Sequence, residues 1–295
     1  MKRQLAFVLG GGASRGALQV GALRALAEAG FTPDILVGTS VGAANAAFLA
    51  IRGFNLGSIE ELVQVWRDTT LADLLPANYL WLTVRALLNR PAENSSQRMR
   101  DFVVAHGLSP DLQFGDIHGV RLGCVACDLN TGRPVIYGLD PIENVLEAVL
   151  ASGALPPWVA PIEQNGRLLT DGGVVSNLPI EPALQFGATR IIALDLADPA
   201  SVPVEGKGFA PFLAKMINTV QLRQLDLELA LAAACEVHVQ RIPLYNKQPV
   251  PLWDFRRTDD LISEGYEIAR QEIARWQAEQ KPGWRGWLDR LFHPN

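Results

Sequence analysis

A serine between two glycines is the first feature of this sequence that points to chemistry. The run GTSVG, residues 38–42, follows an apolar stretch at 34–37 and precedes a helical stretch at 43–51. In a strand–turn–helix unit of this form the serine hydroxyl is exposed on a tight turn, and side chains at Gly38 or Gly42 would collide with the backbone. The pattern predicts a nucleophile at Ser40, with an ordinary turn as the alternative.

A nucleophilic serine needs a base, and the histidines offer no obvious one. None of the four stands in a loop of catalytic build after a strand: they are His106, His118, His238 and His293. A carboxylate is the other candidate, because Asp171 lies between an apolar pair and the glycines Gly172 and Gly173 in LLTDGGV. Taken alone, this DGG sequence favours a structural turn.

The glycine-rich run FVLGGGASRG, residues 7–16, is suited to binding negative charge. Unpaired N–H groups at the start of a helix attract anions, so the loop fits either a cofactor phosphate or a charge that develops during a reaction. A dinucleotide-binding loop would have its third glycine where Arg15 stands. It would also need an acidic residue at the end of the next strand, whereas Asp34 begins that strand, so we rank cofactor binding low.

These residues must be positioned by a sheet, because short apolar runs alternate with helical stretches along the chain. Strands are expected at 4–9, 34–37, 120–127, 134–137, 190–196 and 237–242. Helices are expected at 17–29, 43–51, 59–69, 142–152, 178–186, 212–235 and 260–280. This succession is typical of α/β proteins that have a parallel sheet with helices outside it.

Four short blocks occur together in this chain: the glycine loop, the serine run, ASGALPP at 151–157, and DGG at 171–173. In type and order they resemble the blocks of the patatin-like phospholipase family, across about residues 4–195. The resemblance implies a three-layer α/β/α sandwich with a mostly parallel sheet. It also implies a lipid acyl hydrolase without metal or organic cofactor, in which Ser40 is the nucleophile of a covalent acyl-enzyme and Asp171 is its base.

The resemblance implies that the glycine loop forms the oxyanion hole. Aligned on Arg15 and Gly16, the three glycines of the family fall on Gly11, Gly12 and Ala13, so alanine replaces the third. The change matters if the backbone there must adopt a positive φ. Arg15 either fixes the loop by pairing with a carboxylate or is a solvated charge. The motif-supporting residues are Gly10, Arg15, Gly16, Gly38, Gly42, Gly172 and Gly173.

Bulk composition limits the remaining classes of function. With 295 residues, 48% of them hydrophobic, we expect one catalytic domain over residues 1–280. A formal net charge of −5 argues against nucleic-acid binding. Three cysteines form no disulfide framework and no complete metal site, and the apolar run at the N-terminus is short for a secretory signal. A cytoplasmic protein is therefore expected, either free or peripheral at the membrane.

Two apolar segments carry alternative interpretations. The stretch 77–88 is either a lid or a buried helix. The tail 281–295 has one apolar helical face, which either docks on lipid headgroups or packs on the protein body. That face consists of Trp284, Trp287, Leu288, Leu291 and Phe292.

The function also has alternatives at this stage. One is a general carboxylesterase or thioesterase acting on substrates outside membranes. Another is a lipid-binding regulatory protein in which hydrolysis is incidental. A phospholipase A or lysophospholipase type of esterase, acting on a lipid or other ester, is the function that we expect.

Overall fold

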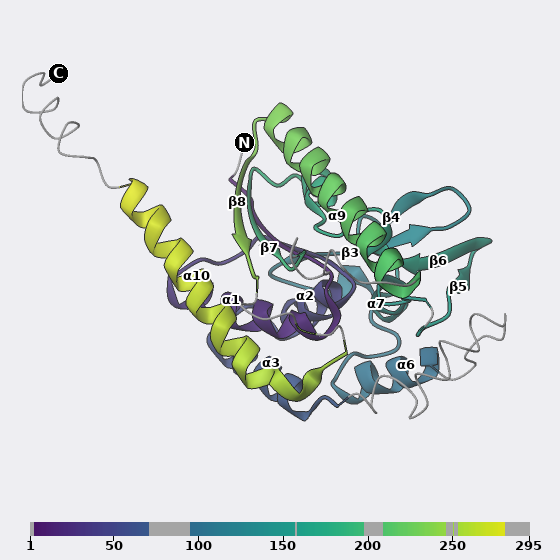
Figure 1. Cartoon of the computed structure of the whole chain (residues 1–295). Helices are drawn as coiled ribbons and strands as arrows, with labels where there is room; N and C mark the ends of the chain where they lie inside the picture. Colours follow the sequence, from purple (N-terminus) through teal and green to yellow (C-terminus); the bar gives the residue numbers. More distant parts are fainter. Residues whose placement is uncertain are drawn as a thin grey trace, which may run out of the picture.

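The computed structural model describes residues 3–70, 95–156, 158–197, 209–245, 250 and 253–280. Within these residues the strands form one sheet in the order β5-β6-β3-β2-β1-β7-β8, with β4 paired to β3 (Figure 1). Their bounds are β1 Leu5–Leu9, β2 Ile35–Thr39, β3 Arg121–Asp128, β4 Arg133–Tyr137, β5 Ile162–Gln164, β6 Arg167–Asp171, β7 Arg190–Asp195 and β8 His238–Pro243.

The centre of the sheet is parallel and one side is antiparallel. The strands β3, β2, β1, β7 and β8 run parallel to one another. In contrast, β4 and β6 pair antiparallel with β3, and β5 pairs antiparallel with β6. The sequences of β1, LAFVL, and β2, ILVGT, are nearly free of polar residues because both faces of these strands are covered by helices.

Helices cover both faces of the sheet. Their bounds are α1 Gly16–Glu28, α2 Val41–Arg52, α3 Leu56–Asp68, α6 Ser95–Ala105, α7 Val145–Ser152, α8 Ile180–Gln185, α9 Phe209–Ala234 and α10 Thr258–Gln280. Side chains alternate along β1: Phe7 and Leu9 join the core shared with α1, α2 and α3, whereas Ala6 and Val8 join the core shared with α8 and α9. The fold is therefore an α/β/α sandwich, as expected.

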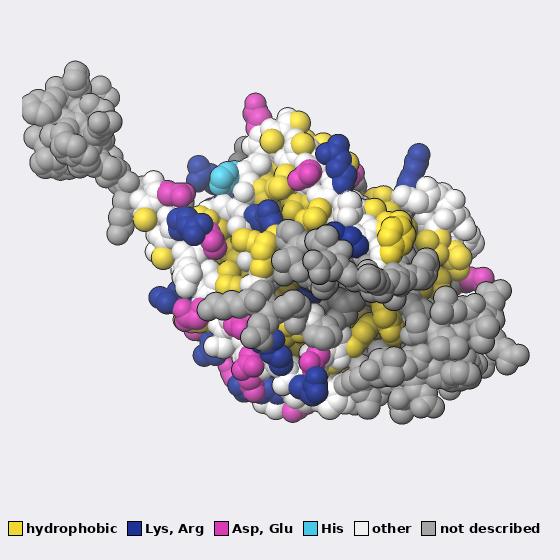
Figure 2. Space-filling view, viewed as in Figure 1, with side chains coloured by type: hydrophobic (Ala, Val, Ile, Leu, Met, Phe, Trp, Pro, Cys, Tyr) yellow, Lys and Arg dark blue, Asp and Glu magenta, His cyan; other side chains and the backbone are white. Residues whose placement is uncertain are grey.

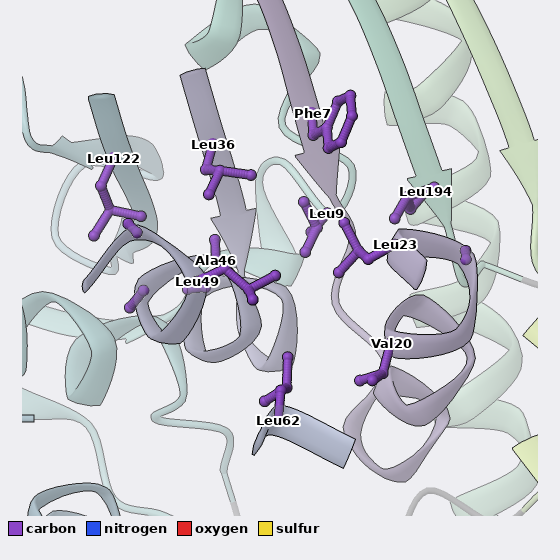
Figure 3. Close-up of a cluster of buried hydrophobic side chains, with 14 of the residues drawn as sticks. Phe7, Leu9, Val20, Leu23, Leu36, Ala46, Leu49, Leu62, Leu122 and Leu194 are labelled. Carbon is purple, nitrogen blue, oxygen red and sulfur yellow. The ribbon is translucent and has the colours of Figure 1, made fainter. Parts of the chain in front are cut away.

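The larger core lies between the sheet and helices α1 and α2. Figure 3 shows strand residues such as Phe7, Leu9 and Leu36 facing Leu23 of α1 and Leu49 of α2. Helix α9 packs against the other face through Leu225, Glu228 and Ala232, whereas much of its described surface is exposed, and hydrophobic side chains lie over this region in Figure 2. The exposed apolar residues on α9 include Phe212, Met216, Ile217, Val220, Leu227 and Leu231.

The expected strands and helices are all present, with ends shifted by a few residues. The sequence did not indicate the β5–β6 hairpin or helix α6. The stretch 77–88 and the tail 281–295 lie outside the described residues, so the lid, the tail and the domain boundary at 280 stay predictions. Among the helices that are described, none has the length and apolar composition needed to cross a bilayer.

Candidate active site

Ser40 occupies a strained turn between β2 and α2. Its backbone has φ 56° and ψ −125°, a conformation that residues other than glycine seldom adopt. A Cβ added to Gly38 would lie 2.2 Å from the carbonyl oxygen of Gly42, and one added to Gly42 would lie 2.1 Å from that of Leu9. Backbone packing therefore requires glycine at both positions, which is the geometry of a nucleophile elbow.

Two buried hydroxyl groups hold this elbow in place. The backbone N–H of Ser40 donates to Ser152 Oγ at 2.8 Å, and the Ser152 hydroxyl donates to the carbonyl of Val125 at 2.6 Å. The hydroxyl of Thr39 donates to the carbonyl of Ser176 at 2.8 Å. Ser152 belongs to the ASGALPP block. This motif was therefore the available signal that Ser152 supports the elbow, a role that was not predicted from the sequence.

Sheet topology brings Asp171 to Ser40. In the sheet β3 lies between β2 and β6, with Thr39 opposite Val125 and Asp171 opposite Ala126. The end of β6 therefore meets the end of β2 at one edge of the sheet. Close packing continues into the next residue, because a Cβ on Gly172 would lie 2.3 Å from the carbonyl oxygen of Val125.

The Asp171 carboxylate is buried and hydrogen-bonded. It accepts the backbone N–H of Gly173 at 2.8 Å and lies close enough to the Ser40 hydroxyl to interact with it. Burial raises the pKa of Asp171 to about 6, although the Ser40 hydroxyl and the Gly173 N–H act to lower it. A carboxyl group with this pKa is ionised at neutral pH and still basic enough to accept a proton from a hydroxyl that is attacking a substrate.

The glycine loop lies beside the elbow, and its N–H groups differ in availability. Gly10 donates to the carbonyl of Leu194 at 3.1 Å, and Gly11 donates to the carbonyl of Asn177 at 3.0 Å. The N–H of Gly11 is thus engaged in this structure, and its expected role as an oxyanion donor stays a prediction. The N–H groups of Gly12 and Ala13 donate to no acceptor among the described residues.

Ala13 has the conformation that a glycine would adopt easily. Its φ is 49°, in the left-handed region, at a cost of roughly 1–2 kcal/mol for a residue with a Cβ. The alanine therefore keeps the positive φ at this position. Arg15, which follows, donates from Nε to the carbonyl of Gly12 at 3.3 Å and thereby braces its own loop. At Gly16 a Cβ would lie 2.5 Å from Val41, so the starts of α1 and α2 pack closely.

Asn177 joins the glycine loop to the loop that carries Asp171. Its backbone carbonyl accepts from Gly11, and its amide nitrogen lies 3.4 Å from the Gly11 carbonyl oxygen, to which it donates. Its side-chain oxygen accepts from Gln221 of α9 at 3.2 Å. Sequence reasoning missed Asn177 and Gln221, because neither stands in a recognisable pattern.

A buried glutamate of α9 also contacts this loop. The Glu228 carboxylate accepts from the hydroxyl of Ser176 at 2.5 Å and from the N–H groups of Ile180 and Glu181 at 2.6 and 2.9 Å. Burial raises the pKa of Glu228 to about 7. The only signal in the sequence was an acidic residue between two leucines of an expected helix, and only the structure shows that Glu228 is buried and what it contacts.

An apolar groove opens beside Ser40. Its volume is about 170 Å³, and its walls come from α2, α3, α6 and α7. Ser40 and Ala13 line it, as do Trp66, Phe102 and Val149. Of the four histidines, His106 lines this groove, where its ring Nδ1 is 2.7 Å from the carbonyl oxygen of Phe102. The groove offers an elongated hydrocarbon a place next to the serine hydroxyl.

The fold and the site define the chain as an α/β sandwich protein with a serine elbow beside a buried aspartate. A family model described as "Patatin-like phospholipase" matches residues 7–184, and the chain belongs to this family. Curated relatives include patatin-like phospholipase domain-containing protein 7 of Mus musculus, 26% identical over 293 residues, covering 92% of this chain and 21% of that protein. Patatin-like phospholipase domain-containing protein 6 of Pongo abelii is 30% identical over 300 residues, covering 92% of this chain and 20% of that protein.

A further relative is lysophospholipase nte1 of Aspergillus terreus, 24% identical over 302 residues, covering 94% of this chain and 18% of that protein. The chain thus spans about a fifth of the length of the curated relatives it matches. Among solved structures, it is similar to VipD from Legionella pneumophila, with a TM-score of 0.48, 13% identity and coverage of 92% of this chain and 67% of that one.

Proposed function

We propose that this chain is a lipid acyl hydrolase, which cleaves carboxylic ester bonds with Ser40 as nucleophile and Asp171 as general base. The observation that carries the proposal is the Ser40 hydroxyl beside the buried Asp171 carboxylate, on a strained elbow that opens into an apolar groove. Family membership and the names of the relatives support a phospholipase or lysophospholipase type of activity.

Acylation begins when Asp171 accepts the hydroxyl proton and Ser40 Oγ attacks the ester carbonyl carbon. The carbonyl oxygen gains the negative charge, and the N–H groups of Gly12 and Ala13 stabilise it. When the tetrahedral intermediate collapses, the C–O bond to the alcohol breaks. The leaving alcohol takes the proton back from Asp171, and the acyl group stays on Ser40.

Deacylation repeats these steps with water. Asp171 removes a proton from a water molecule, whose oxygen attacks the acyl carbonyl carbon while the same two N–H groups bind the oxyanion. The bond to Ser40 Oγ then breaks, and Ser40 takes the proton from Asp171. The products are a carboxylic acid and the unchanged enzyme, so each turnover consumes one ester and one water.

The direct test is release of fatty acid from lysophosphatidylcholine and of p-nitrophenol from p-nitrophenyl butyrate. We expect Ser40→Ala and Asp171→Asn each to lower kcat by at least 10³-fold on both substrates, in line with the loss of a nucleophile or its base. Ser263→Ala, at an exposed position on α10 that does not line the groove, is the matched control and should keep full activity. Equal rates for wild type and Ser40→Ala would rule the proposal out.

The two substrates also separate the alternatives. Turnover of the soluble ester alone, with none of the lysophospholipid, would indicate a general carboxylesterase rather than a lipid hydrolase. Turnover of neither substrate would favour a binding protein. The proposal requires Ser40-dependent turnover of both.

A further inference from the structure

The groove follows one face of helix α2 along its whole length. It is lined from Ser40, which caps the helix, through Val41, Ala44, Phe48 and Ile51 to Arg52 at the last position. These positions recur every three or four residues and so share one face. The residues Ala46 and Leu49 lie on the other face and point toward the sheet (Figure 3). The groove therefore extends along the full length of α2, the helix that begins directly after Ser40.

The walls of the groove leave a ligand almost no polar partner. Asn45 lines it, but its amide nitrogen already donates to Gly16 O and Gln19 Oε1, at 3.2 and 3.1 Å. Its oxygen accepts the indole N–H of Trp66 at 2.9 Å. Thr69 likewise donates its hydroxyl to its own helix, at 2.6 Å from Val65 O. With these groups satisfied internally, the groove favours hydrocarbon over a polar ligand.

Charged and polar residues mark the far end of the groove. The Arg52 guanidinium lies over the ring of Phe48, 5.9 Å from its centroid, and 3.9 Å from the Glu61 carboxylate. A Cβ on Gly107 would lie 2.7 Å from the guanidinium, so the turn after α6 is in contact with Arg52. The apolar wall ends where these groups begin.

Two estimates give the length of chain that fits. The twelve helical steps from Ser40 to Arg52 rise about 18 Å at roughly 1.5 Å each, and an extended alkyl chain advances about 1.25 Å per carbon for a C–C bond of about 1.52 Å, which gives about 14 carbons. A volume of 170 Å³ holds about a dozen water-sized groups, at roughly 10–15 Å³ each, which is compatible with a chain of this length.

We propose that the groove is an acyl ruler, which binds a linear acyl chain of about 12–14 carbons with its carbonyl at Ser40 and its methyl end at Arg52. The proposal rests on the proposed function, since it places the acyl group of the substrate in that same site. Position along α2 then sets which carbon a side chain meets. Ala44 lies about 6 Å from Ser40 along the helix, near the fifth carbon, and Ile51 lies about 16 Å away, near the thirteenth.

The ruler can be tested on the wild-type protein with saturated fatty acids of 4–20 carbons as inhibitors. Each acid is kept below its micellar concentration, and its inhibition of p-nitrophenyl butyrate hydrolysis is measured. Each added methylene should lower the inhibition constant by about threefold to fourfold. This improvement should stop at about 12–14 carbons, where the groove ends. A plateau below eight carbons, or an unbroken improvement to twenty, overturns the ruler.

Substitutions along α2 test the same idea by position. Ala44→Phe should lower the ratio of turnover of the fourteen-carbon ester to that of the four-carbon ester by about 100-fold relative to wild type. Ile51→Trp should lower the ratio of turnover of the fourteen-carbon ester to that of the eight-carbon ester by about tenfold. Ala230→Phe, at an exposed position on α9, is the control and should change none of these rates.

The outcomes separate the ruler from the proposed function. If Ala44→Phe and Ile51→Trp lower turnover of all chain lengths equally, the ruler is wrong, while Ser40-dependent turnover of the short ester still supports the hydrolase. If Ser40→Ala hydrolyses every ester as wild type does, the hydrolase itself is wrong. Retained turnover of the short ester shows that a variant is folded, and the inhibitor series needs no variant at all.

Discussion

The backbone N–H of Ser40 and the hydroxyl of Ser152 form a hydrogen bond of 2.8 Å, although 112 residues separate them in sequence. Ser152 is fully buried at the end of α7, and its hydroxyl donates a hydrogen bond to the carbonyl of Val125. One hydroxyl thus ties the strained elbow to the central strand β3. Such a link stabilises a backbone conformation that the isolated turn would not maintain.

Removing the Ser152 hydroxyl should leave the backbone of Ser40 less firmly held in its strained conformation. We expect Ser152→Ala to lower kcat for p-nitrophenyl butyrate about tenfold and the free energy of unfolding by about 1–3 kcal/mol, because two buried polar groups lose their partner. Steady-state kinetics and urea unfolding measure the two effects. Ser263→Ala controls for loss of an exposed serine, and an unchanged kcat in Ser152→Ala would show that the elbow does not depend on this bond.

The pH dependence of turnover should report Asp171. Burial raises the pKa of this carboxyl group to about 6, and only its ionised form can accept a proton from Ser40. We expect kcat for the soluble ester to rise about tenfold per pH unit below pH 6 and to level off above it. Circular dichroism at each pH checks that the protein stays folded. A rate that is flat from pH 4.5 to 8 would contradict the role of Asp171 as base.

The same raised pKa makes a prediction for stability. The pKa of Asp171 is higher in the folded protein than its ordinary value of 3.8, so the folded state binds the proton more tightly. The stability contributed by this group is full below pH 4 and is lost as the pH rises through about 6. At pH 8, removing the buried charge with Asp171→Asn should therefore stabilise the protein, by up to about 3 kcal/mol.

Urea unfolding of wild type and Asp171→Asn at pH 8 and at pH 4 measures this difference. The variant should be inactive yet unfold at a higher urea concentration at pH 8, and the gap should close at pH 4. A variant that is less stable than wild type at pH 8 would show that hydrogen bonds to the carboxylate outweigh its burial.

Glu228 should act on the site through the loop that it holds. It accepts three hydrogen bonds from residues 176, 180 and 181, and the carbonyl of Ser176 in turn accepts the hydroxyl of Thr39, next to Ser40. We expect Glu228→Ala to lower kcat about tenfold with little change in KM, because the loop loses its anchor. Glu228→Gln keeps an acceptor for the backbone N–H groups and should restore most of the activity.

Asp226→Ala, on the exposed face of the same helix, is the control for Glu228. It should leave kcat unchanged. If Glu228→Ala unfolds at lower temperature but keeps wild-type kcat when folded, the residue serves stability alone.

The elbow was predictable from sequence because all of its determinants are local. The apolar strand, the two glycines and the helix start lie within residues 34–52, and steric exclusion at Gly38 and Gly42 follows from the turn itself. The parallel core of the sheet was predictable for the same reason. Runs such as LAFVL and ILVGT are buried on both faces and therefore read as uninterrupted apolar strands.

The partners of the elbow were less predictable, because they depend on pairing between distant segments. The strand β6, RLLTD, is short and mixed in polarity, so its antiparallel pairing with β3 leaves no periodic signal. The helix α6, SSQRMRDFVVA, is likewise mixed in composition. The DGG block located Asp171 by resemblance alone, and the engaged N–H of Gly11 appeared only with the contact to Asn177.

In the proposed mechanism Ser40 carries the acyl group during turnover, and covalent labelling of the protein is the sharpest test of that role. The protein is treated with an alkyl fluorophosphonate, digested with trypsin and analysed by mass spectrometry. The label should appear on the peptide of residues 25–52 at Ser40, be absent from Ser40→Ala, and form much more slowly in Asp171→Asn. Labelling of Ser40→Ala at the wild-type rate, or of another residue with Ser40 untouched, would contradict the claim.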